Sequence, residues 1–206
     1  MSRYTGPKAR ISRRLGTNIF GTAGEVKALD KRPYPPGEHG RTRRRGNVSE
    51  YLLQMQEKQK ARFTYGLTER QFRNLYEEAN RREGVTGENM LRFLELRLDN
   101  VAYSLGFASS RAQGRQLVRH GHVEVNGKKI NIPSYQVRKG DVIQVREKSR
   151  KNDQVRQAVE TAAGRGVPSW LQLEPDAFRG TVTDLPKRED IRLPIQEQLI
   201  VELYSK

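Results

Sequence analysis

Arginine side chains recur in the middle of this chain at a spacing that could bind phosphate. Arg111, Arg115 and Arg119 lie four residues apart and would share one face of a helix. A guanidinium group can hold a phosphate through two parallel hydrogen bonds and can stack on a base. A charged row is also an ordinary feature of a solvated helix face. The neighbouring Gln116, the glycine-rich turns and the basic pair at 128 and 129 favour phosphate contact.

Two histidines beside this row, His120 and His122, suggest a metal site at first sight. The only other histidine is His39, which is distant in sequence, and the chain has no cysteine. A chain without cysteine has no disulfide, no thiolate zinc site and no cysteine nucleophile. We therefore predict no metal and no cofactor. The imidazoles are interpreted as groups that pack, or that bond to backbone or nucleic acid.

Acidic residues offer no convincing catalytic pair. Asp99 lies in an Arg-Leu-Asp-Asn motif, where a salt bridge to Arg97 is the ordinary role. Asp141 follows a turn glycine and is expected to accept local backbone N–H groups. The segment from Gly121 to Lys129 resembles a P-loop, but it has five residues between its glycines instead of four, and lysine where serine or threonine would hold magnesium. We predict that the protein is not an enzyme.

The charge balance points to a polyanionic partner. The 206 residues carry 39 Lys and Arg against 24 Asp and Glu, a net charge of +15. The first 47 residues hold twelve basic and three acidic side chains, a net of +9. Nucleic acid is the usual partner of such a chain, and an anionic membrane surface is the alternative. We see no basic amphipathic helix with a strong apolar face, no lipidation site and no apolar run of about 18 residues, so we expect a cytoplasmic protein without membrane contact.

The arginine row needs a helix to position it, and local signals define one. A helix starting at Ser109 or Ser110 and ending at Gly121 carries the row. A long helix precedes it, because apolar residues recur at helical spacing from 91 to 105. The pattern then changes to period two: Val123 to Val125, the Asn-Gly pair at 126 and 127, Ile130 to Ile132, and a further strand at 142–145. Asn-Gly between alternating runs predicts a hairpin, so we expect two helices packed on a small antiparallel sheet.

The flanking segments differ in composition. Residues 1–47 show no persistent period, so we expect an extended arm, whose scattered aromatic and apolar side chains suit threading into folded RNA. Ser49 starts a helix closed by Gly66, and a second helix begins with the capping-box pair Thr68 and Gln71. The tail from 148 contains a helix-like stretch over 153–166, short strands and turns, and a last amphipathic helix. Its net charge of only +1 favours contact with protein.

The stretches GFASSRAQGRQLVRHGHVEVNG and IPSYQVRKGDVI closely resemble the RNA-binding module named after small-subunit ribosomal protein S-four. The flanks MSRYTGPKARISRRLGTNIF, EKQKARFTYGLTERQFRNLYEEA and LIVELYSK resemble the bacterial S-four ribosomal protein family, so the likeness covers the whole chain. It implies an α+β fold with an extended basic N-terminal arm (1–47) and a small helical domain (48–90, completed by 190–206). The RNA-binding module (91–150) is inserted, and a C-terminal region (151–206) packs on both domains.

The resemblance implies a structural role in the small subunit: primary binding of the 5′ domain of rRNA, nucleation of assembly, lining of the mRNA entry channel and a contribution to accuracy. Some members also repress translation of their own message. Expected RNA-binding residues are Arg3, Tyr4, Lys8, Arg13, Arg14, Lys58, Lys60, Arg62, Arg70, Arg73, Arg111, Arg115, Arg119, His120 and Lys128. Expected residues at the mRNA entry are Arg41, Arg43, Arg44 and Arg45.

The implied partners are the rRNA 5′ domain, mRNA, and ribosomal proteins S-five and S-three, which makes the protein ribosome-bound. Many family members carry a zinc-binding cysteine cluster in the arm, which this chain lacks, so zinc is not carried over. The same module occurs in RNA chaperones and ribosome-associated factors, which form the alternative reading. A pseudouridine synthase would need a catalytic domain of about 200 residues that this length does not accommodate.

Overall fold

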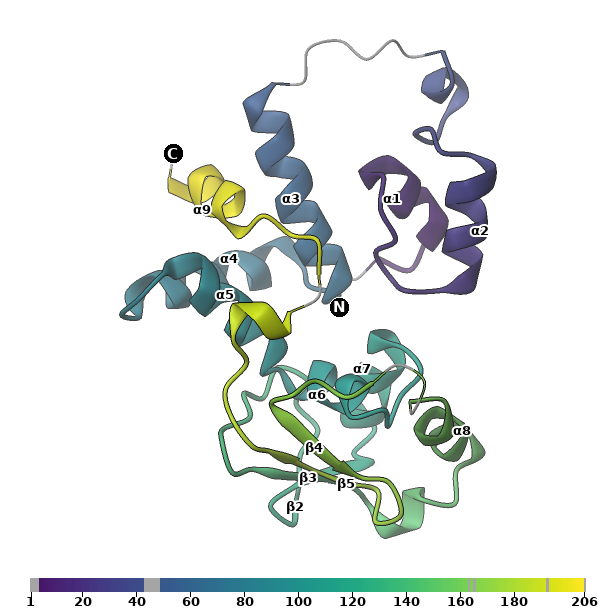
Figure 1. Ribbon diagram of the computed structural model, residues 1–206, viewed down its shortest axis with the longest axis vertical. Coiled ribbons are helices and arrows are strands. Elements are labelled where there is room, and N and C mark those ends of the chain that lie inside the picture. Colours follow the sequence, from purple (N-terminus) through teal and green to yellow (C-terminus); the bar gives the residue numbers. More distant parts are fainter. Residues whose placement is uncertain (1–3, 43–48, 163, 165, 192, 206) are drawn as a thin grey trace. The chain divides into compact units, whose positions relative to one another are not determined.

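The computed structural model describes residues 4–42, 49–162, 164, 166–191 and 193–205 (Figure 1). Within these ranges the chain forms nine α-helices and five strands. All strand pairs are antiparallel, and the predicted α+β class is confirmed. The chain divides into two compact units: unit 1, residues 1–87 with 193–206, and unit 2, residues 88–192. Helix α5 (Thr86–Glu95) spans the boundary in the sequence.

Unit 1 is helical, with short caps that set where its helices begin and end. Its elements are α1 (Lys8–Leu15), α2 (Ala23–Lys31), a 3₁₀ turn (Glu38–Gly40), α3 (Glu50–Thr64), α4 (Glu69–Arg81) and α9 (Glu197–Ser205). Ser49 caps α3 by accepting from the Leu52 N–H at 3.3 Å. Thr68 and Gln71 form the predicted capping box of α4. Gly66 takes φ +64° between the two helices, as a C-terminal glycine should.

The N-terminal segment departs from the prediction, because its described residues include two helices where an extended arm was expected. Thr22 and Glu25 form a capping box at the start of α2. The buried Glu25 carboxylate also accepts from the Ser12 hydroxyl of α1 and from the Phe20 N–H. Burial alone would raise the pKa of Glu25, but the hydrogen bonds from Ser12, Thr22 and the backbone outweigh it and lower the pKa. A polar centre therefore joins α1 to α2 where aliphatic side chains are few.

Helix α9 packs on α3 within unit 1, and Figure 1 shows the two helices adjacent. Ile200 of α9 is fully buried. The Gln54 amide donates to Glu202 at 3.1 Å, and the Tyr204 ring stacks on Tyr76 at 4.7 Å between centroids. The Tyr204 hydroxyl donates to Glu69, and burial together with this bond raises the pKa of Tyr204. These contacts join the last residues of the chain to α3 and α4, about 130 to 150 positions earlier.

Unit 2 is built on one five-stranded sheet in the order β2-β1-β3-β5-β4. The strands are β1 (Val123–Val125), β2 (Lys128–Lys129), β3 (Val142–Val145), β4 (Leu171–Glu174) and β5 (Arg179–Val182). The helices are α6 (Leu98–Ser104), α7 (Arg111–Arg119) and α8 (Asp153–Ala162), with 3₁₀ turns at Glu147–Ser149 and Arg188–Asp190. Strand β5 pairs with β3, so residues beyond 150 belong to the same sheet as the module. Apolar side chains of α6, α7 and the strands form its core.

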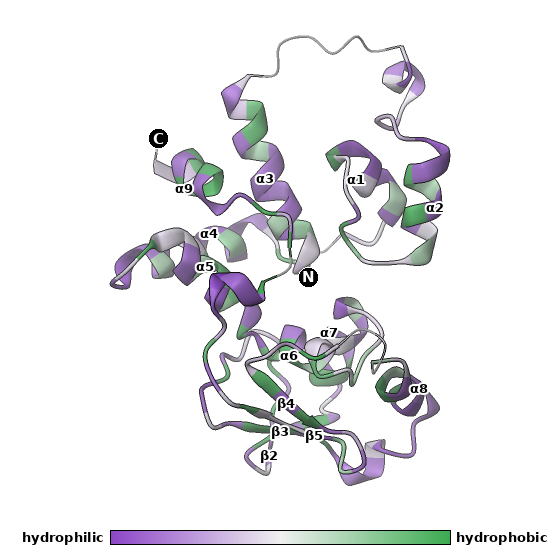
Figure 2. Ribbon diagram, in the orientation of Figure 1, coloured by the Kyte–Doolittle hydropathy of each residue, from purple (hydrophilic) through white to green (hydrophobic). Residues whose placement is uncertain are grey.

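The hydropathy of the residues agrees with this arrangement (Figure 2). Hydrophobic residues lie along β4, and α8 has one hydrophobic and one hydrophilic side. Val155, Ala158 and Ala162 of α8 are buried. Trp170, the only tryptophan, is 2% exposed in this core.

The predicted single helix over 91–105 is wrong, because the chain forms α5 and α6 with a break between them. Arg97 adopts extended geometry (φ −66°, ψ 134°) and bridges Gln136. The Leu98 N–H donates to the Tyr135 carbonyl at 2.8 Å, and the Val137 N–H donates to the Leu96 carbonyl at 2.9 Å. Backbone pairing with 133–137 replaces the helical hydrogen bonds at the break, although the apolar period continues through it.

The predicted hairpin is confirmed, because Asn126 and Gly127 have φ of 51° and 74°. Strand β2 is shorter than expected, since it ends at Lys129. Ile130 and Ile132 lie outside the strand, and Ile132 is 55% exposed. The second hairpin strand therefore consists of Lys128–Lys129, and the run predicted at 130–132 does not form a strand.

Candidate nucleic-acid interface

Helix α7 carries the arginine row and begins at Ser110, whose side chain accepts from the Gln113 N–H at 3.3 Å. Gly114 allows α7 to approach α6 closely, because a Cβ there would lie 2.6 Å from the Asp99 carbonyl oxygen. This approach brings the first two arginines of the row against α6. Of the three arginines, only Arg119 is exposed.

The two half-buried arginines contact polar groups of α6. Arg115 Nη1 lies 3.3 Å from Asp99 Oδ2. Arg111 Nε donates to Asn100 Oδ1 at 2.8 Å, and its guanidinium carbon lies 4.7 Å from the centre of the Tyr103 ring. These contacts hold the guanidinium groups of Arg111 and Arg115 in place, so these two side chains are positioned and do not rotate freely.

Asp99 is the centre of this network, and its carboxylate is occupied by arginine partners instead of being available for acid–base chemistry. Both of its carboxylate oxygens accept from Arg97, at 3.0 and 2.7 Å. Arg97 and Asp99 are 5% and 4% exposed. The predicted salt bridge is confirmed. The predicted role of Asp141 is also confirmed, since it accepts from the Arg138 N–H at 2.8 Å and from the Asn126 amide at 2.8 Å.

A second group of cations gathers where α7 meets β1. The exposed His120 ends α7, and its ring centre lies 6.1 Å from that of His122. Lys129 of β2 covers Gly121, because a Cβ at Gly121 would lie 2.3 Å from Lys129 Cε. Arg146 Nη1 donates to the Gly121 carbonyl at 3.4 Å. We call His120, His122, Lys129 and Arg146 the hairpin cluster.

The electrostatics of His122 follow from this crowding. Its Nδ1 lies 2.9 Å from the Ser149 hydroxyl. Burial, and then the charges of His120, Arg146 and Lys129, lower the pKa of His122. Among the described residues no group of three or more His, Cys, Asp or Glu side chains is arranged to hold a metal ion. Lys129 and Arg146 give the cluster its positive charge, which suits an anion.

Sequence reasoning did not include Lys129 and Arg146 among the site residues. The hairpin register could have indicated Lys129, because it places this residue opposite Glu124. Arg146 pairs with Glu124 at 3.1 Å across β1 and the end of β3, a contact that no local pattern shows. Lys128 was predicted and is exposed beside Lys129.

In unit 1, three predicted RNA-binding residues form ion pairs within the fold. Lys58 is 6% exposed and its Nζ lies 2.7 Å from Glu69. Lys60 pairs with Glu57, and Arg62 Nε lies 3.9 Å from Glu69 and also donates to Gln59 at 2.8 Å. Arg70 and Arg73 are exposed on α4. Arg73 pairs with Glu77 at 3.3 Å, a surface contact that contributes little free energy.

The N-terminal candidates lie on and around α1. Lys8 is 5.6 Å from the centre of the Phe20 ring, and the Tyr4 ring contacts Phe63 edge-on at 5.7 Å. Arg13 donates to backbone carbonyls, whereas Arg14 and Arg41 are exposed. The remaining predicted residues, Arg3, Arg43, Arg44 and Arg45, lie outside the described residues.

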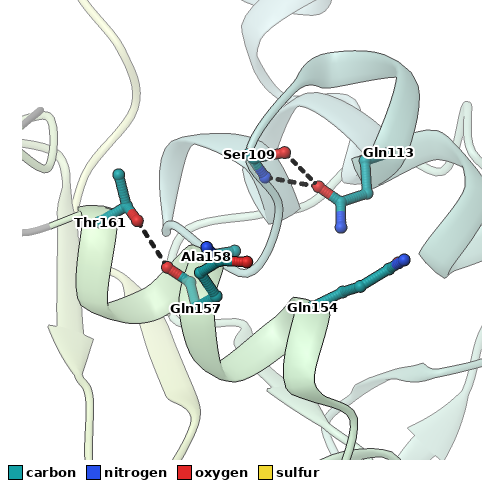
Figure 3. A pocket seen from close by; sticks show the side chains of 6 residues that line it. All are labelled: Ser109, Gln113, Gln154, Gln157, Ala158 and Thr161. Atoms are coloured by element: carbon teal, nitrogen blue, oxygen red, sulfur yellow. Dashed lines mark hydrogen bonds between the residues drawn. The ribbon is translucent and has the colours of Figure 1, made fainter.

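A pocket of about 540 Å³ between α7 and α8 has a different character (Figure 3). Its lining is neutral: Ser109, Gln113, Gln154, Gln157, Ala158 and Thr161. Gln113 Oε1 accepts from the N–H and the hydroxyl of Ser109, at 2.7 and 2.6 Å. With no charged residue in its described lining, this pocket has no electrostatic preference for a phosphate.

Comparison with known proteins covers the whole chain. The family model described as "Ribosomal protein S4/S9 N-terminal domain" matches residues 3–95, and the model "S4 domain" matches residues 96–143. The small ribosomal subunit protein uS4 of Citrifermentans bemidjiense is 58% identical over all of both chains. The proteins of that name from Saccharopolyspora erythraea and Corynebacterium aurimucosum are 57% and 55% identical over all of both chains. This chain belongs to the uS4 family of ribosomal proteins.

The uS4 assignment confirms the predicted family and the prediction that the protein is not an enzyme. The S4 domain match begins at Leu96 and covers α6, α7, β1 and β2, the elements that carry the arginine row and most of the hairpin cluster. No helix within the described part of this uS4 chain is long and apolar enough to cross a membrane.

Proposed function

We propose that this chain is a structural constituent of the small ribosomal subunit that binds the 5′ domain of small-subunit rRNA directly and nucleates assembly there. The observation that carries the proposal is full-length identity of 55 to 58% to uS4 proteins, together with an S4 domain whose exposed side is cationic. Exposed cations on α7 and the hairpin, Arg119, Lys128 and Lys129, suit RNA recognised by its backbone and shape. The cellular location that follows is the cytoplasm, bound to the ribosome.

The described cations fall into two roles under this proposal. Arg111 and Arg115 are positioned by α6, so their guanidinium planes present a fixed geometry to the RNA. Arg119, Lys128 and the hairpin cluster supply the contacts that displace counterions from phosphates. Lys58 and Lys60 act mainly on the fold, because each forms an ion pair with a glutamate. Arg70 and Arg73 extend the cationic surface of unit 1.

Further partners are part of the same proposal. The exposed Arg41 supports a cationic segment at the mRNA entry channel, to which Arg43, Arg44 and Arg45 would contribute. The nearly neutral C-terminal region fits protein contact with ribosomal proteins S-five and S-three, through which the protein would contribute to accuracy. Repression of its own message would use the same RNA-binding surface.

Binding to the isolated rRNA 5′ domain across a salt series tests the proposal, with an unrelated structured RNA of equal length as control. We expect affinity that falls steeply with salt and that exceeds the control by at least about 10³-fold, the lower range for specific over non-specific binding. Arg119→Gln with Lys128→Gln should weaken 5′-domain binding, whereas Gln172→Ala, an exposed change on β4, should not.

Equal affinity for both RNAs would overturn the proposal of a primary rRNA binder. The favoured reading would then be the alternative, an RNA chaperone or ribosome-associated factor that uses the same module without sequence preference. Binding that does not respond to salt would contradict the phosphate-contact mechanism itself.

A further inference from the structure

A cationic groove lies between α1, α2 and the proline-rich segment that follows α2, entirely within residues 7–36. It encloses about 410 Å³. None of the expected RNA-binding residues apart from Arg13 lines it. Figure 1 shows α1 and α2 side by side, and residues of both helices line the groove.

Hydrogen bonds and close backbone packing hold the walls of the groove. Arg13 Nε donates to the carbonyls of Arg32 and Tyr34, each at 3.1 Å, and its guanidinium carbon lies 5.0 Å from the centre of the Tyr34 ring. Gly40 approaches this segment so closely that a Cβ would lie 1.9 Å from the Pro35 carbonyl oxygen. Glu25 joins α1 to α2 through Ser12. The groove is therefore a feature of a folded subdomain.

The charges around the groove are all of one sign. Of its described lining residues four are basic and none is acidic. Arg10, Lys31 and Arg32 are exposed, and their side chains make no hydrogen bond or ion pair with any other residue that the structure describes. Three cations without an internal partner, converging on one hollow, are complementary to a phosphodiester.

The remaining lining residues, which we call the floor of the groove, are apolar. Pro7, Ala9, Ala28 and Pro36 present small apolar surfaces, and the last three are half-buried. A nucleobase offers a flat face that packs on apolar side chains and arginine planes, while its phosphates reach a charged rim. An acidic peptide would satisfy the rim and leave the floor exposed to water. The combination favours a nucleotide over a peptide.

We propose that this groove binds a nucleotide of single-stranded RNA, with the base against the alanines and prolines and the phosphates at Arg10, Lys31 and Arg32. The inference rests on the proposed rRNA-binding function and assigns it a discrete subsite in the N-terminal segment. Arg10, Lys31 and Arg32 contribute charge, and the apolar floor contributes selectivity for a base over a bare backbone.

Alanine methyl NMR of the full-length protein reads this groove directly, because Ala9 and Ala28 lie in its floor. The probes are hexauridylate, an abasic ribose-phosphate hexamer of equal charge, and hexaglutamate. We expect hexauridylate to shift the Ala9 and Ala28 signals through the ring current of a base. The abasic hexamer and hexaglutamate should shift these two signals at most one-fifth as far.

Two matched pairs of variants separate the rim from the floor. Lys31→Gln should raise about threefold the hexauridylate concentration at which the Ala9 shift is half complete. Lys27→Gln, one turn earlier on α2 and outside the groove, should leave this concentration unchanged. Ala28→Leu fills the floor and should abolish the Ala9 shift. Ala23→Leu, at an exposed position of α2, should preserve it. The other alanine signals report that each variant is folded.

Absent shifts at Ala9 and Ala28 with saturating hexauridylate would overturn the subsite, as would equal shifts from hexaglutamate, which would identify a protein partner. The 5′-domain salt series on the same variants keeps the two proposals apart. If wild-type protein prefers the 5′ domain but the alanine signals do not move, only the subsite fails. If the alanine signals move but the 5′-domain preference is absent, the proposed rRNA specificity fails and the nucleotide site stands.

Discussion

The buried carboxylate of Asp99 pairs with two arginines. One pair stabilises the fold, and the other positions a residue of the candidate nucleic-acid interface. Arg97 closes the break between α5 and α6, and Arg115 belongs to the arginine row of α7. Neither contact is exposed enough to be screened as a surface ion pair is. The same side chain therefore supports the fold and fixes the direction of a candidate RNA-binding arginine.

Replacing Asp99 with Asn should destabilise unit 2 by about 3–5 kcal/mol, because it leaves a buried cation without its partner. Trp170 lies in the core of this unit, so its fluorescence in a urea titration measures the change. The exposed Asp176→Asn is the control and should shift the midpoint little. A midpoint for Asp99→Asn equal to wild type would contradict the assigned role.

The pKa of His122 predicts how the stability of unit 2 depends on pH. Because burial and the neighbouring cations lower the pKa of His122, the folded protein binds this proton less tightly than the unfolded chain does. The resulting stability is present above pH ~6.5, the ordinary histidine pKa, and is lost as the pH falls from there through the folded pKa. Protonation therefore favours unfolding.

Urea unfolding followed by Trp170 between pH 7.5 and 5 should show falling stability, and His122→Asn should reduce the slope below pH ~6.5. His39→Asn, at an exposed position of unit 1, should not change that slope. An unchanged slope in the His122 variant would assign the pH dependence to other groups.

At the scale of elements, α9 completes unit 1 although it comes from the end of the chain. Its packing on α3 rests on the fully buried Ile200 and on polar contacts at both ends: Gln54 with Glu202, and the Gln196 N–H with Glu57 at 3.1 Å. The side chains of α3 that face α9 are therefore polar as well as apolar. Local periodicity describes α3 poorly for this reason.

Ile200→Ala should destabilise unit 1 by about 2–5 kcal/mol, because it removes buried methyl groups and leaves a cavity. We expect faster amide hydrogen exchange in α9 and in α3, with unit 2 unaffected. Gln198→Ala on the exposed side of α9 provides the comparison and should leave the exchange rates near those of wild type. If amide exchange became faster in α9 alone, the stability of α3 would not depend on its packing against α9.

For the whole molecule the uneven charge is the dominant property. The first 47 residues carry +9 of the net +15. The free chain therefore concentrates self-repulsion in a segment whose helices are joined by few apolar contacts, and RNA relieves that repulsion. This segment also contains the cationic groove.

Deleting residues 1–47 should weaken binding to the rRNA 5′ domain and make the slope of log K against log salt less negative by about 3, at ~0.7 for each of four or five lost phosphate contacts. Unit 2 should still unfold cooperatively, as followed by Trp170. An unchanged salt slope would show that the segment makes few phosphate contacts. Loss of the Trp170 transition would show that unit 2 requires it.

Short-range chemistry was predictable from the residues alone. The Thr68–Gln71 capping box, the Asn126–Gly127 turn and the local bonds of Asp141 depend on neighbours in sequence, and the structure contains all three. The helices of the N-terminal segment were missed although Thr22 and Glu25 carry the same capping signal. Their core is a hydrogen-bonded carboxylate, which a search for apolar periodicity does not detect.

The sequence by itself determined the charge, the likeness to a ribosomal protein family, the α+β class and the arginine row. Only the tertiary structure decided that the helix predicted over 91–105 breaks at Arg97, that α9 returns to α3, and which cations are committed to partners inside the fold. The physical reason is the same in each case. Local propensity depends on adjacent residues, whereas backbone pairing with 133–137 and the buried contacts of Asp99 depend on groups that only folding brings together.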